Sequence, residues 1–234
     1  MIETQQLCKR YGRTAALRDV TLAIAKGTFC TVLGPNGSGK TTLMQILATL
    51  SRPTSGSVKL LGFDPETQGN QIRKQIGVVS HQSFLYPSLT AYENLKFYGR
   101  MFGVADLEDT ISSLLHEFGL FARMSDPVRT FSRGMQQRLA IARALLHHPL
   151  ILLLDEPFAG LDYAATDILQ KVLEQSRKAG RTVVLTTHDL DRGLEQGDQV
   201  AVLVKGRLVY TGAAKAIDRS RLVEIQLAES EESL

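Results

Sequence analysis

A glycine-rich stretch, GPNGSGKTT, has the residue types and spacing of a loop that binds phosphate. It fits the pattern G-x-x-x-x-G-K-[ST], and it lies between the apolar run FCTVL and the helix-like LMQILATL. Its glycines let the backbone curl so that successive N–H groups point at phosphate oxygens. We expect Lys40 to reach the β- and γ-phosphates and the Thr41 hydroxyl to bind Mg²⁺. The motif predicts a nucleotide site made by Gly34, Pro35, Asn36, Gly37, Ser38, Gly39, Lys40, Thr41 and Thr42.

Two adjacent acids end the apolar run ILLLDEP, residues 151–157. A buried strand has little use for two carboxylates at its tip unless a cation lies there. Asp155 is expected to help hold Mg²⁺, through water or directly. Glu156 is then the residue to orient and deprotonate the attacking water. Pro157 predicts an extended backbone at Glu156 and a break before any following helix.

Two further polar side chains follow predicted strands. His188 comes directly after RTVVLTT, and Gln82 comes just after IGVVS. Active sites of parallel sheets gather at such strand tips. We therefore expect His188 to contact the γ-phosphate and Gln82 to reach Mg²⁺ or the water. The remaining histidines have no ligand-like companions and are interpreted as surface or packing residues: His81, His116, His147 and His148.

A second anion site is predicted in TFSRGMQQRLAIARAL, residues 130–145. Apolar or small residues recur there at helical spacing, and Ser132 and Gly134 sit where the first turn would begin. The N-terminus of a helix carries unpaired N–H groups and a partial positive charge, so it attracts anions. This predicted anion site is far from the phosphate loop in sequence.

Strands alternate with helices, which favours an α/β protein with a parallel sheet covered on both faces. Between Ser83 and about His148 the chain is mainly helical, and a further helix is expected at about 163–178. A turn at Lys205-Gly206 joins two late strands, and residues 213–234 form a short helix and a polar tail. Other strands are expected at roughly 2–7, 20–24, 28–33, 57–61, 76–80, 150–154 and 182–186.

Composition narrows the class of protein. The chain has 234 residues, 44% of them hydrophobic, and a net charge of +3 that argues neither for nor against nucleic acid. No apolar run approaches the about 20 residues that span a bilayer, and the start of the chain lacks a signal-peptide core. Its two cysteines suggest no disulfide framework, and Cys30 is expected in the core. A cytoplasmic protein is the simplest expectation.

The order of GPNGSGKTT, Gln82, FSRGMQQR, ILLLDEP, AGLD and TTHD is similar to that of ABC-transporter ATPase subunits, and it covers essentially the whole chain. The resemblance implies one domain, residues 1–234, with a P-loop NTPase core. It also implies an antiparallel β subdomain and a helical insertion at about 83–148. Tyr11, in KRYG, resembles the aromatic residue that stacks on adenine in that family.

In that family two subunits pack head to tail. The helix opened by the signature motif, here FSRGM at residues 131–135, then holds the γ-phosphate on the other subunit. The resemblance implies that Ser132 gives a hydroxyl and Gly134 a backbone N–H to the partner's ATP, and that Asp162 lies at the dimer seam. ATP binding would then close a homodimer and hydrolysis would open it. The signature departs from Leu-Ser-Gly-Gly-Gln at Phe131, Arg133 and Met135. Arg133 adds charge and removes the conformational freedom of glycine.

The implied function is ATP hydrolysis that drives transport through a separate membrane subunit, at the cytoplasmic face of the membrane. Six of the fifteen Phe and Tyr residues lie between Phe84 and Phe102. They form either a groove for a helix of that subunit or the core of the insertion. Residues 131–149 resemble exporter ATPases, including multidrug exporters and the haem exporters of cytochrome c maturation. We therefore expect export, with haem as one candidate cargo.

Other classes of ATPase fit the sequence less well. DNA-repair ABC ATPases insert a long coiled coil between the phosphate loop and the signature, and only about ninety residues separate Lys40 from Ser132. Translation-associated ABC ATPases carry two cassettes in one chain, and this chain has one. A GTPase would need an Asn-Lys-x-Asp motif, which the chain lacks. We expect no nucleic-acid partner.

Overall fold

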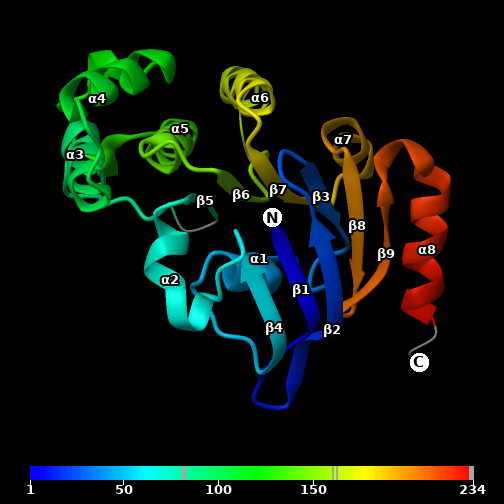
Figure 1. Ribbon diagram of the computed structural model, residues 1–234. Coiled ribbons are helices and arrows are strands. Elements are labelled where there is room, and N and C mark those ends of the chain that lie inside the picture. Colours follow the sequence, from blue (N-terminus) through cyan, green and yellow to red (C-terminus); the bar gives the residue numbers. More distant parts are fainter. Residues whose placement is uncertain (81–82, 160, 162, 232–234) are drawn as a thin grey trace.

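A large sheet organises the molecule (Figure 1). The computed structural model describes residues 1–80, 83–159, 161 and 163–231. Within these residues six strands pair in the order β5-β6-β7-β3-β8-β9, and all pairs are parallel except the edge pair β8–β9. The strands are β3 (Phe29–Leu33), β5 (Ile76–Val79), β6 (Ile151–Asp155), β7 (Thr182–Thr187), β8 (Gln199–Val204) and β9 (Arg207–Ala213).

Strand β6 shows why this sheet is covered on both faces. All five of its residues are buried. Ile151 and Leu153 belong to the core beneath helix α1 (Lys40–Leu47), while Leu152 and Leu154 belong to the core beneath α5 (Arg133–Leu145). Successive side chains of a strand point to opposite faces, so a run of four apolar residues needs a cover on each side.

A smaller antiparallel sheet, β2-β1-β4, packs against α1. Its strands are β1 (Ile2–Tyr11), β2 (Thr14–Ile24) and β4 (Ser55–Leu60). Ile2, Leu7, Val20 and Leu22 are buried in the same core as the α1 side chains. The predicted antiparallel β subdomain is therefore confirmed, and it lies beside the phosphate loop.

The predicted helical insertion is also confirmed. Helices α3 (Ala91–Phe102) and α4 (Leu107–Glu117) lie beyond α5, on the side of the sheet edge formed by β5 (Figure 1). A capping box between Thr90 and Glu93 opens α3, and Gly103 closes it with φ 69°. Short 3-10 turns at Phe121–Arg123 and Val128–Thr130 lead into α5.

The C-terminal third follows the expected order. Helix α6 (Tyr163–Lys178) has the predicted bounds, and the β8–β9 turn uses Lys205 and Gly206, both with positive φ. A 3-10 turn (Ala214–Ala216) and α8 (Arg219–Glu231) then lie along the β8–β9 edge (Figure 1). Among the described residues, no helix combines the length and apolar character needed to cross a bilayer.

Four elements differ from expectation. Helix α2 (Pro65–Arg73) was not predicted, because it buries only Gly69 and Ile72 and has no apolar stripe. Its signal was instead the Asp64 cap with proline in the first turn. Helix α7 (Leu190–Gln196) was not predicted either; it is a seven-residue helix that begins after the Asp189 cap. Strands β1 and β2 run much further than 2–7 and 20–24, because they pair with each other up to Tyr11 and Thr14.

Candidate functional site

The phosphate loop, residues 34–42, connects β3 to α1 and is packed against two neighbouring strands. A Cβ at Gly34 would lie 2.1 Å from the Leu203 carbonyl oxygen, and one at Gly39 would lie 2.6 Å from that of Ala16. Both positions therefore require glycine. The loop is curled and braced as the motif predicted, with a backbone close to β8 on one side and β2 on the other.

Ser38 sits at the centre of this bracing. Its carbonyl accepts a hydrogen bond from Gly206 N at 2.9 Å, and the Gly206 carbonyl accepts one from Arg18 N at 2.7 Å. The Ser38 side chain is 2% exposed, and its hydroxyl has no hydrogen-bond partner among the described residues. A buried hydroxyl without a partner in a glycine cradle fits a ligand that brings oxygen atoms, such as a phosphate.

Lys40 is buried at the start of α1 and lies at the hub of the site. Its Nζ donates to the carbonyls of Gly34, at 2.8 Å, and Pro35, at 3.1 Å, and lies 3.6 Å from Glu156 Oε1. Burial lowers the pKa of the Lys40 ammonium, and the charges of Glu156 and Asp155 oppose that shift. The nearby carboxylates thus offset part of the cost of desolvating this cation.

Strands β6 and β7 hold the two acids. Asp155 is 3% exposed and accepts a 2.7 Å hydrogen bond from the Thr186 hydroxyl. Glu156 N donates to the same hydroxyl at 2.9 Å, and Glu156 Oε2 lies 3.1 Å from His188 Nδ1. The side chains of Lys40, Glu156 and His188, predicted from three separate motifs, are therefore brought into one row.

The backbone of Glu156 corrects one expectation. Its φ is 49°, in the left-handed region, whereas Pro157 predicted an extended residue. A left-handed residue other than glycine costs roughly 1–2 kcal/mol. The two hydrogen bonds from Glu156 N to Thr186, through its hydroxyl and its carbonyl, hold this conformation. The strand ending at Asp155 turns sharply there, while the Glu156 carboxylate lies between Lys40 and His188.

Thr186 is the residue that the sequence interpretation missed. It joins Asp155 to the backbone of Glu156, although nothing in its own type indicates such a role. The available signal was its place: TT stands at the end of an apolar strand, directly before His188. Adjacent parallel strands bring residues at the same level side by side, and Thr186 pairs with Asp155.

Two of the three predicted Mg²⁺ ligands lie around one hollow. Thr41 and Asp155 both line a cavity of about 160 Å³ together with Gln45, Ser80 and Phe84. Hydroxyl and carboxylate oxygens are ligands that suit Mg²⁺, which keeps several waters. The third predicted ligand, Gln82, lies outside the described residues, as do His81 and Asp162.

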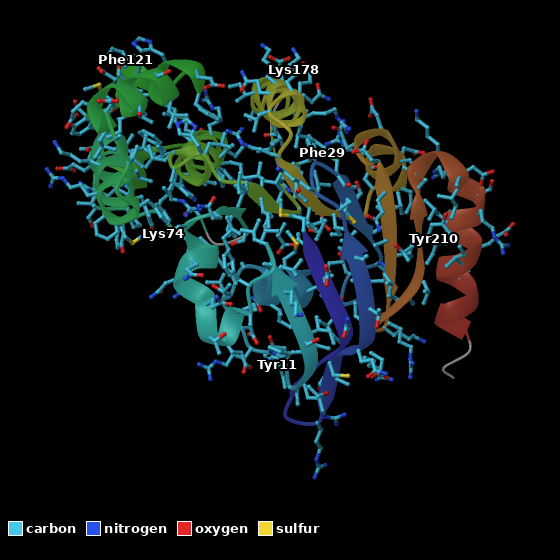
Figure 2. The ribbon with its side chains drawn as sticks, in the orientation of Figure 1. Tyr11, Phe29, Lys74, Phe121, Lys178 and Tyr210 are labelled. Carbon is cyan, nitrogen blue, oxygen red and sulfur yellow. The ribbon has the colours of Figure 1, made fainter. Side chains whose placement is uncertain are left out.

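Tyr11 ends β1 with its ring 49% exposed (Figure 2). Its hydroxyl is 3.4 Å from Gln45 Oε1 of α1, and Lys9 Nζ lies 4.9 Å from the ring centroid. An exposed aromatic ring anchored beside α1 is able to stack on a planar base.

The signature helix α5 begins as predicted. Ser132 is its N-cap, and the Ser132 hydroxyl accepts a 3.3 Å hydrogen bond from Met135 N. Ser132 and Arg133 are exposed. The next turn faces the acids, because Gln137 donates to the Pro157 carbonyl at 3.4 Å. A hollow of about 170 Å³ lies between the start of α5 and the tip of β6; it is lined by Ser80, Ser83, Arg133, Gln136, Gln137, Asp155, Glu156, Ala159 and Leu161.

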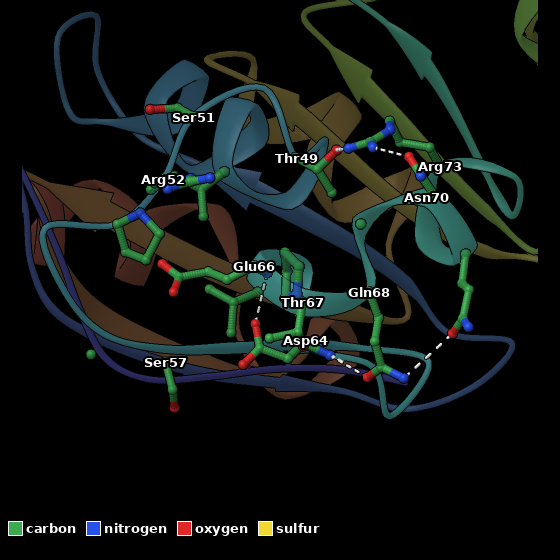
Figure 3. A pocket seen from close by; sticks show the side chains of 17 residues that line it. Thr49, Ser51, Arg52, Ser57, Asp64, Glu66, Thr67, Gln68, Asn70 and Arg73 are labelled. Carbon is green, nitrogen blue, oxygen red and sulfur yellow. Dashed lines mark hydrogen bonds between the residues drawn. The ribbon is translucent and has the colours of Figure 1, made fainter.

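A larger hollow of about 610 Å³ lies elsewhere, between the end of α1, β4 and α2 (Figure 3). Polar groups around it bond one another: the backbone N–H of Asp64 donates to the Gln68 side chain, the Gln68 side chain donates to Gln71, and Arg73 donates to Thr49. None of the predicted site residues lines it. This hollow is larger than the two beside Asp155, but it lies apart from the row of Lys40, Glu156 and His188, and we assign it no chemistry.

This chain is similar in sequence to known proteins that bind ATP. A family model described as ABC transporter matches residues 17–159. The ABC transporter ATP-binding protein NatA of Bacillus subtilis is 36% identical over 212 residues, which are 89% of this chain and 86% of that protein. Nod factor export ATP-binding protein I of Cupriavidus pinatubonensis is 35% identical over 214 residues, 91% of this chain and 66% of that protein.

A solved structure is similar over almost its whole length. It is the dimeric, post-hydrolysis state of the ATP-binding cassette MJ0796 bound to ADP and Pi. Its TM-score to this chain is 0.84 at 30% sequence identity, and the match covers 92% of this chain and 99% of that one.

Proposed function

Because the chain belongs to the ABC transporter family and is an ATP-binding, ATP-hydrolysing subunit, we propose that it drives export of a substrate through a separate membrane subunit. The observation that carries the catalytic part is the row of side chains at the phosphate loop. Lys40 Nζ lies 3.6 Å from Glu156 Oε1, and Glu156 Oε2 lies 3.1 Å from His188 Nδ1. A phosphate-binding cation, a base and a polar partner are thus held together.

ATP would occupy the phosphate loop, residues 34–42, with its base on Tyr11. The glycine cradle and the unpartnered Ser38 hydroxyl support this placement. Backbone N–H groups of the loop and the start of α1 would bind the phosphate oxygens, and Lys40 would reach the β- and γ-phosphates. The exposed ring of Tyr11 provides a stacking surface beside α1.

Mg²⁺ would be held by Thr41, Asp155 and Gln82. When bound, it supplies charge neutralisation for the β- and γ-phosphate oxygens. The Thr186 hydroxyl keeps Asp155 in place by donating to one of its oxygens.

Glu156 would act as the general base. It would take a proton from a water whose oxygen bonds to the γ-phosphorus, while the bond from that phosphorus to the bridging oxygen of ADP breaks. His188 would orient the Glu156 carboxylate and contact the γ-phosphate. The left-handed backbone of Glu156 supports this role, because strained residues held by neighbours cluster at functional sites.

Two copies of the chain would close around ATP. Ser132 and Gly134 at the start of α5 would bind the γ-phosphate on the other copy, and Asp162 would lie at the seam. The exposed N-terminus of α5 and the dimeric state of the similar cassette support this arrangement. Ligand binding that requires two copies stabilises their association, and hydrolysis removes that stabilisation.

A membrane-spanning subunit would then carry the substrate, with this chain bound at its cytoplasmic face. Tyr86, Phe97 and Met101 form an exposed apolar patch on the helical insertion that suits a partner helix. The export protein among the relatives supports the direction of transport. Haem as cargo stays a prediction from residues 131–149 alone, since the cargo would contact the membrane subunit.

Purification of the tagged chain from native membranes in mild detergent tests the proposal. We expect a membrane-spanning protein to copurify in a fixed ratio, and ATP hydrolysis by the complex. Recovery with ribosomes or DNA in place of a membrane protein would overturn the transport role and favour a non-transport ABC ATPase.

A further inference from the structure

Arg143 is a buried cation that the nucleotide chemistry above does not use. It lies in the second half of the signature helix α5 and is 7% exposed. No ion pair links it to an acid among the described residues, and its Nε has no hydrogen-bond partner there. Burial lowers the pKa of its guanidinium. Keeping a charge in such a place is costly, so its contacts must offset that cost.

Those contacts reach from α5 to two other parts of the protein. Arg143 Nη2 donates to the Val78 carbonyl of β5 at 2.6 Å. Its guanidinium carbon lies 5.4 Å from the centroid of the Phe84 ring and 5.2 Å from that of Tyr98 on α3. Cation–π attraction is stronger between desolvated groups than at exposed sites, so these ring contacts help to offset the cost of burying the charge. One side chain thus joins α5, β5, α3 and the segment that follows β5.

Arg143 and Tyr98 together hold Phe84 in place. Its φ is 53°, in the left-handed region, and the Tyr98 hydroxyl donates to its carbonyl. A bulky residue keeps such a conformation only where its surroundings enforce it. Phe84 also lines the same hollow as Thr41 and Asp155. Moving Phe84 would therefore change the wall of the proposed Mg²⁺–ATP site.

The cluster also reaches the surface. Tyr98 contacts Phe97, with ring centroids 5.2 Å apart, and Phe97 contacts Tyr86 at 5.1 Å. Phe97 and Tyr86 are 44% and 46% exposed. A continuous set of rings therefore runs from the apolar patch on the insertion to Arg143 and to the hollow.

We propose that Arg143 is a positioning residue that holds Phe84 as a wall of the hollow containing Thr41 and Asp155, and so couples the signature helix to ATP hydrolysis. This rests on the proposed function. Arg143 lines neither the hollow with Thr41 nor the hollow at the start of α5; it would act through Phe84 and Tyr98. Its removal should therefore reduce the rate of hydrolysis much more than the affinity for ATP.

Arg138 provides a matched control on the same helix. Its Nη1 donates to the Phe118 carbonyl at 2.9 Å, so it ties α5 to the interior of the helical insertion. Within the part of the chain that the structure describes, no hydrogen bond, ion pair or cation–π contact links Arg138 to β5 or to Phe84. Arg138→Lys and Arg143→Lys both keep the charge and lose the planar fork of donors. Only the second change weakens the link to the hollow.

The experiment measures kcat, KM and ATP affinity for the parent, Arg143→Lys, Tyr98→Phe, the double variant and Arg138→Lys. We expect Arg143→Lys to lower kcat on the order of tenfold, because small misplacements in an active site are costly. ATP affinity should stay within about twofold, and Arg138→Lys should leave kcat near the parent value. The double variant should be less impaired than the product of the two single effects, since both residues act on Phe84.

A spectroscopic reading keeps the proposal testable if Arg143→Lys folds poorly. The chain has no tryptophan, so Phe84→Trp introduces a single reporter at the wall. In that background Tyr98→Phe should shift the emission to longer wavelength, while Arg138→Lys should not.

Equal loss of kcat in the Arg143 and Arg138 variants, or an unchanged kcat and emission in Arg143→Lys and Tyr98→Phe, would overturn the positioning role. Absence of hydrolysis in the parent would instead overturn the proposed function itself.

Discussion

The two anion-binding regions of this chain differ in how far one molecule completes them. At the phosphate loop, Lys40 and Asp155 are 6% and 3% exposed, and each has partners from another element of the same chain. At the start of α5, Ser132 and Arg133 are exposed, and the Ser132 hydroxyl bonds only within its own helix turn. The first region is therefore largely built by one chain, whereas the second leaves its groups exposed, where the proposed second copy would bind them.

The largest effect is expected from Glu156→Gln, which removes the proposed base and leaves the phosphate loop intact. Loss of a general base costs typically 10²–10⁴-fold in rate, so kcat should fall by about that factor while ATP binding remains. The variant should accumulate as an ATP-bound dimer. Size-exclusion chromatography and phosphate release measure both effects, with the exposed Glu195→Gln as the control. Parent-like hydrolysis by Glu156→Gln would show that another group is the base.

Lys40→Ala tests ATP binding at the phosphate loop. A charge-assisted hydrogen bond contributes about 1.5–3 kcal/mol, so ATP affinity should weaken on the order of 10- to 100-fold. Titration with a fluorescent ATP analogue measures the affinity. Lys171→Ala, which removes an exposed lysine paired with Asp167, is the control. An unchanged affinity in Lys40→Ala would rule out its phosphate contact.

Ser132→Arg sharpens the contrast between the regions. Ser132 is exposed and outside the phosphate loop, so binding of ATP to one subunit should persist. ATP-dependent dimerisation should weaken roughly tenfold or more, because a bulky group replaces the hydroxyl at the proposed seam. Ser132→Thr, which keeps a hydroxyl and a helix cap, should dimerise normally. Undiminished dimers of Ser132→Arg in the Glu156→Gln background would contradict a shared site.

The smallest effect concerns His147, at the end of the signature helix. Burial, together with the charges of Arg143 and His148, lowers its pKa to about 4, although its bond to the Ile76 carbonyl opposes the shift. The unfolded chain takes up this proton near pH 6.5, so stability should fall as the pH drops from about 6.5 to about 4. The full difference between the two pKa values corresponds to about 3 kcal/mol, and because solvent screens the partly exposed ring we expect a loss of about 1–2 kcal/mol.

Thermal unfolding of the parent, His147→Gln and His148→Gln across that pH range checks this expectation. His147→Gln should lose part of the pH dependence, and His148→Gln, at an exposed position, should keep it. The same slope in all three proteins would show that His147 is not responsible.

The aromatic segment illustrates how far the sequence interpretation reached. Two roles were open for the residues between Phe84 and Phe102, a docking groove or the core of the insertion. Tyr92 and Tyr98 pack against the core, while Tyr86 and Phe97 are about half exposed. The segment serves packing with one part and presents a surface with another, because α3 turns Tyr92 and Tyr98 inward and Phe97 outward, while Tyr86 lies in the segment before α3.

Local sequence patterns were enough to predict the features that depend on neighbours along the chain. These are the phosphate loop between a strand and a helix, the acids at the tip of β6, the Ser132 cap and the bounds of α6. Each follows from a local pattern of glycine, apolar spacing or capping residues. Three features could be seen only in the folded molecule: the left-handed turn of Glu156, the bonds of Thr186 to Asp155 and Glu156, and the buried site of Arg143. These depend on which strands and helices lie side by side, and hydrogen bonds between elements outweigh the local preference of any one residue.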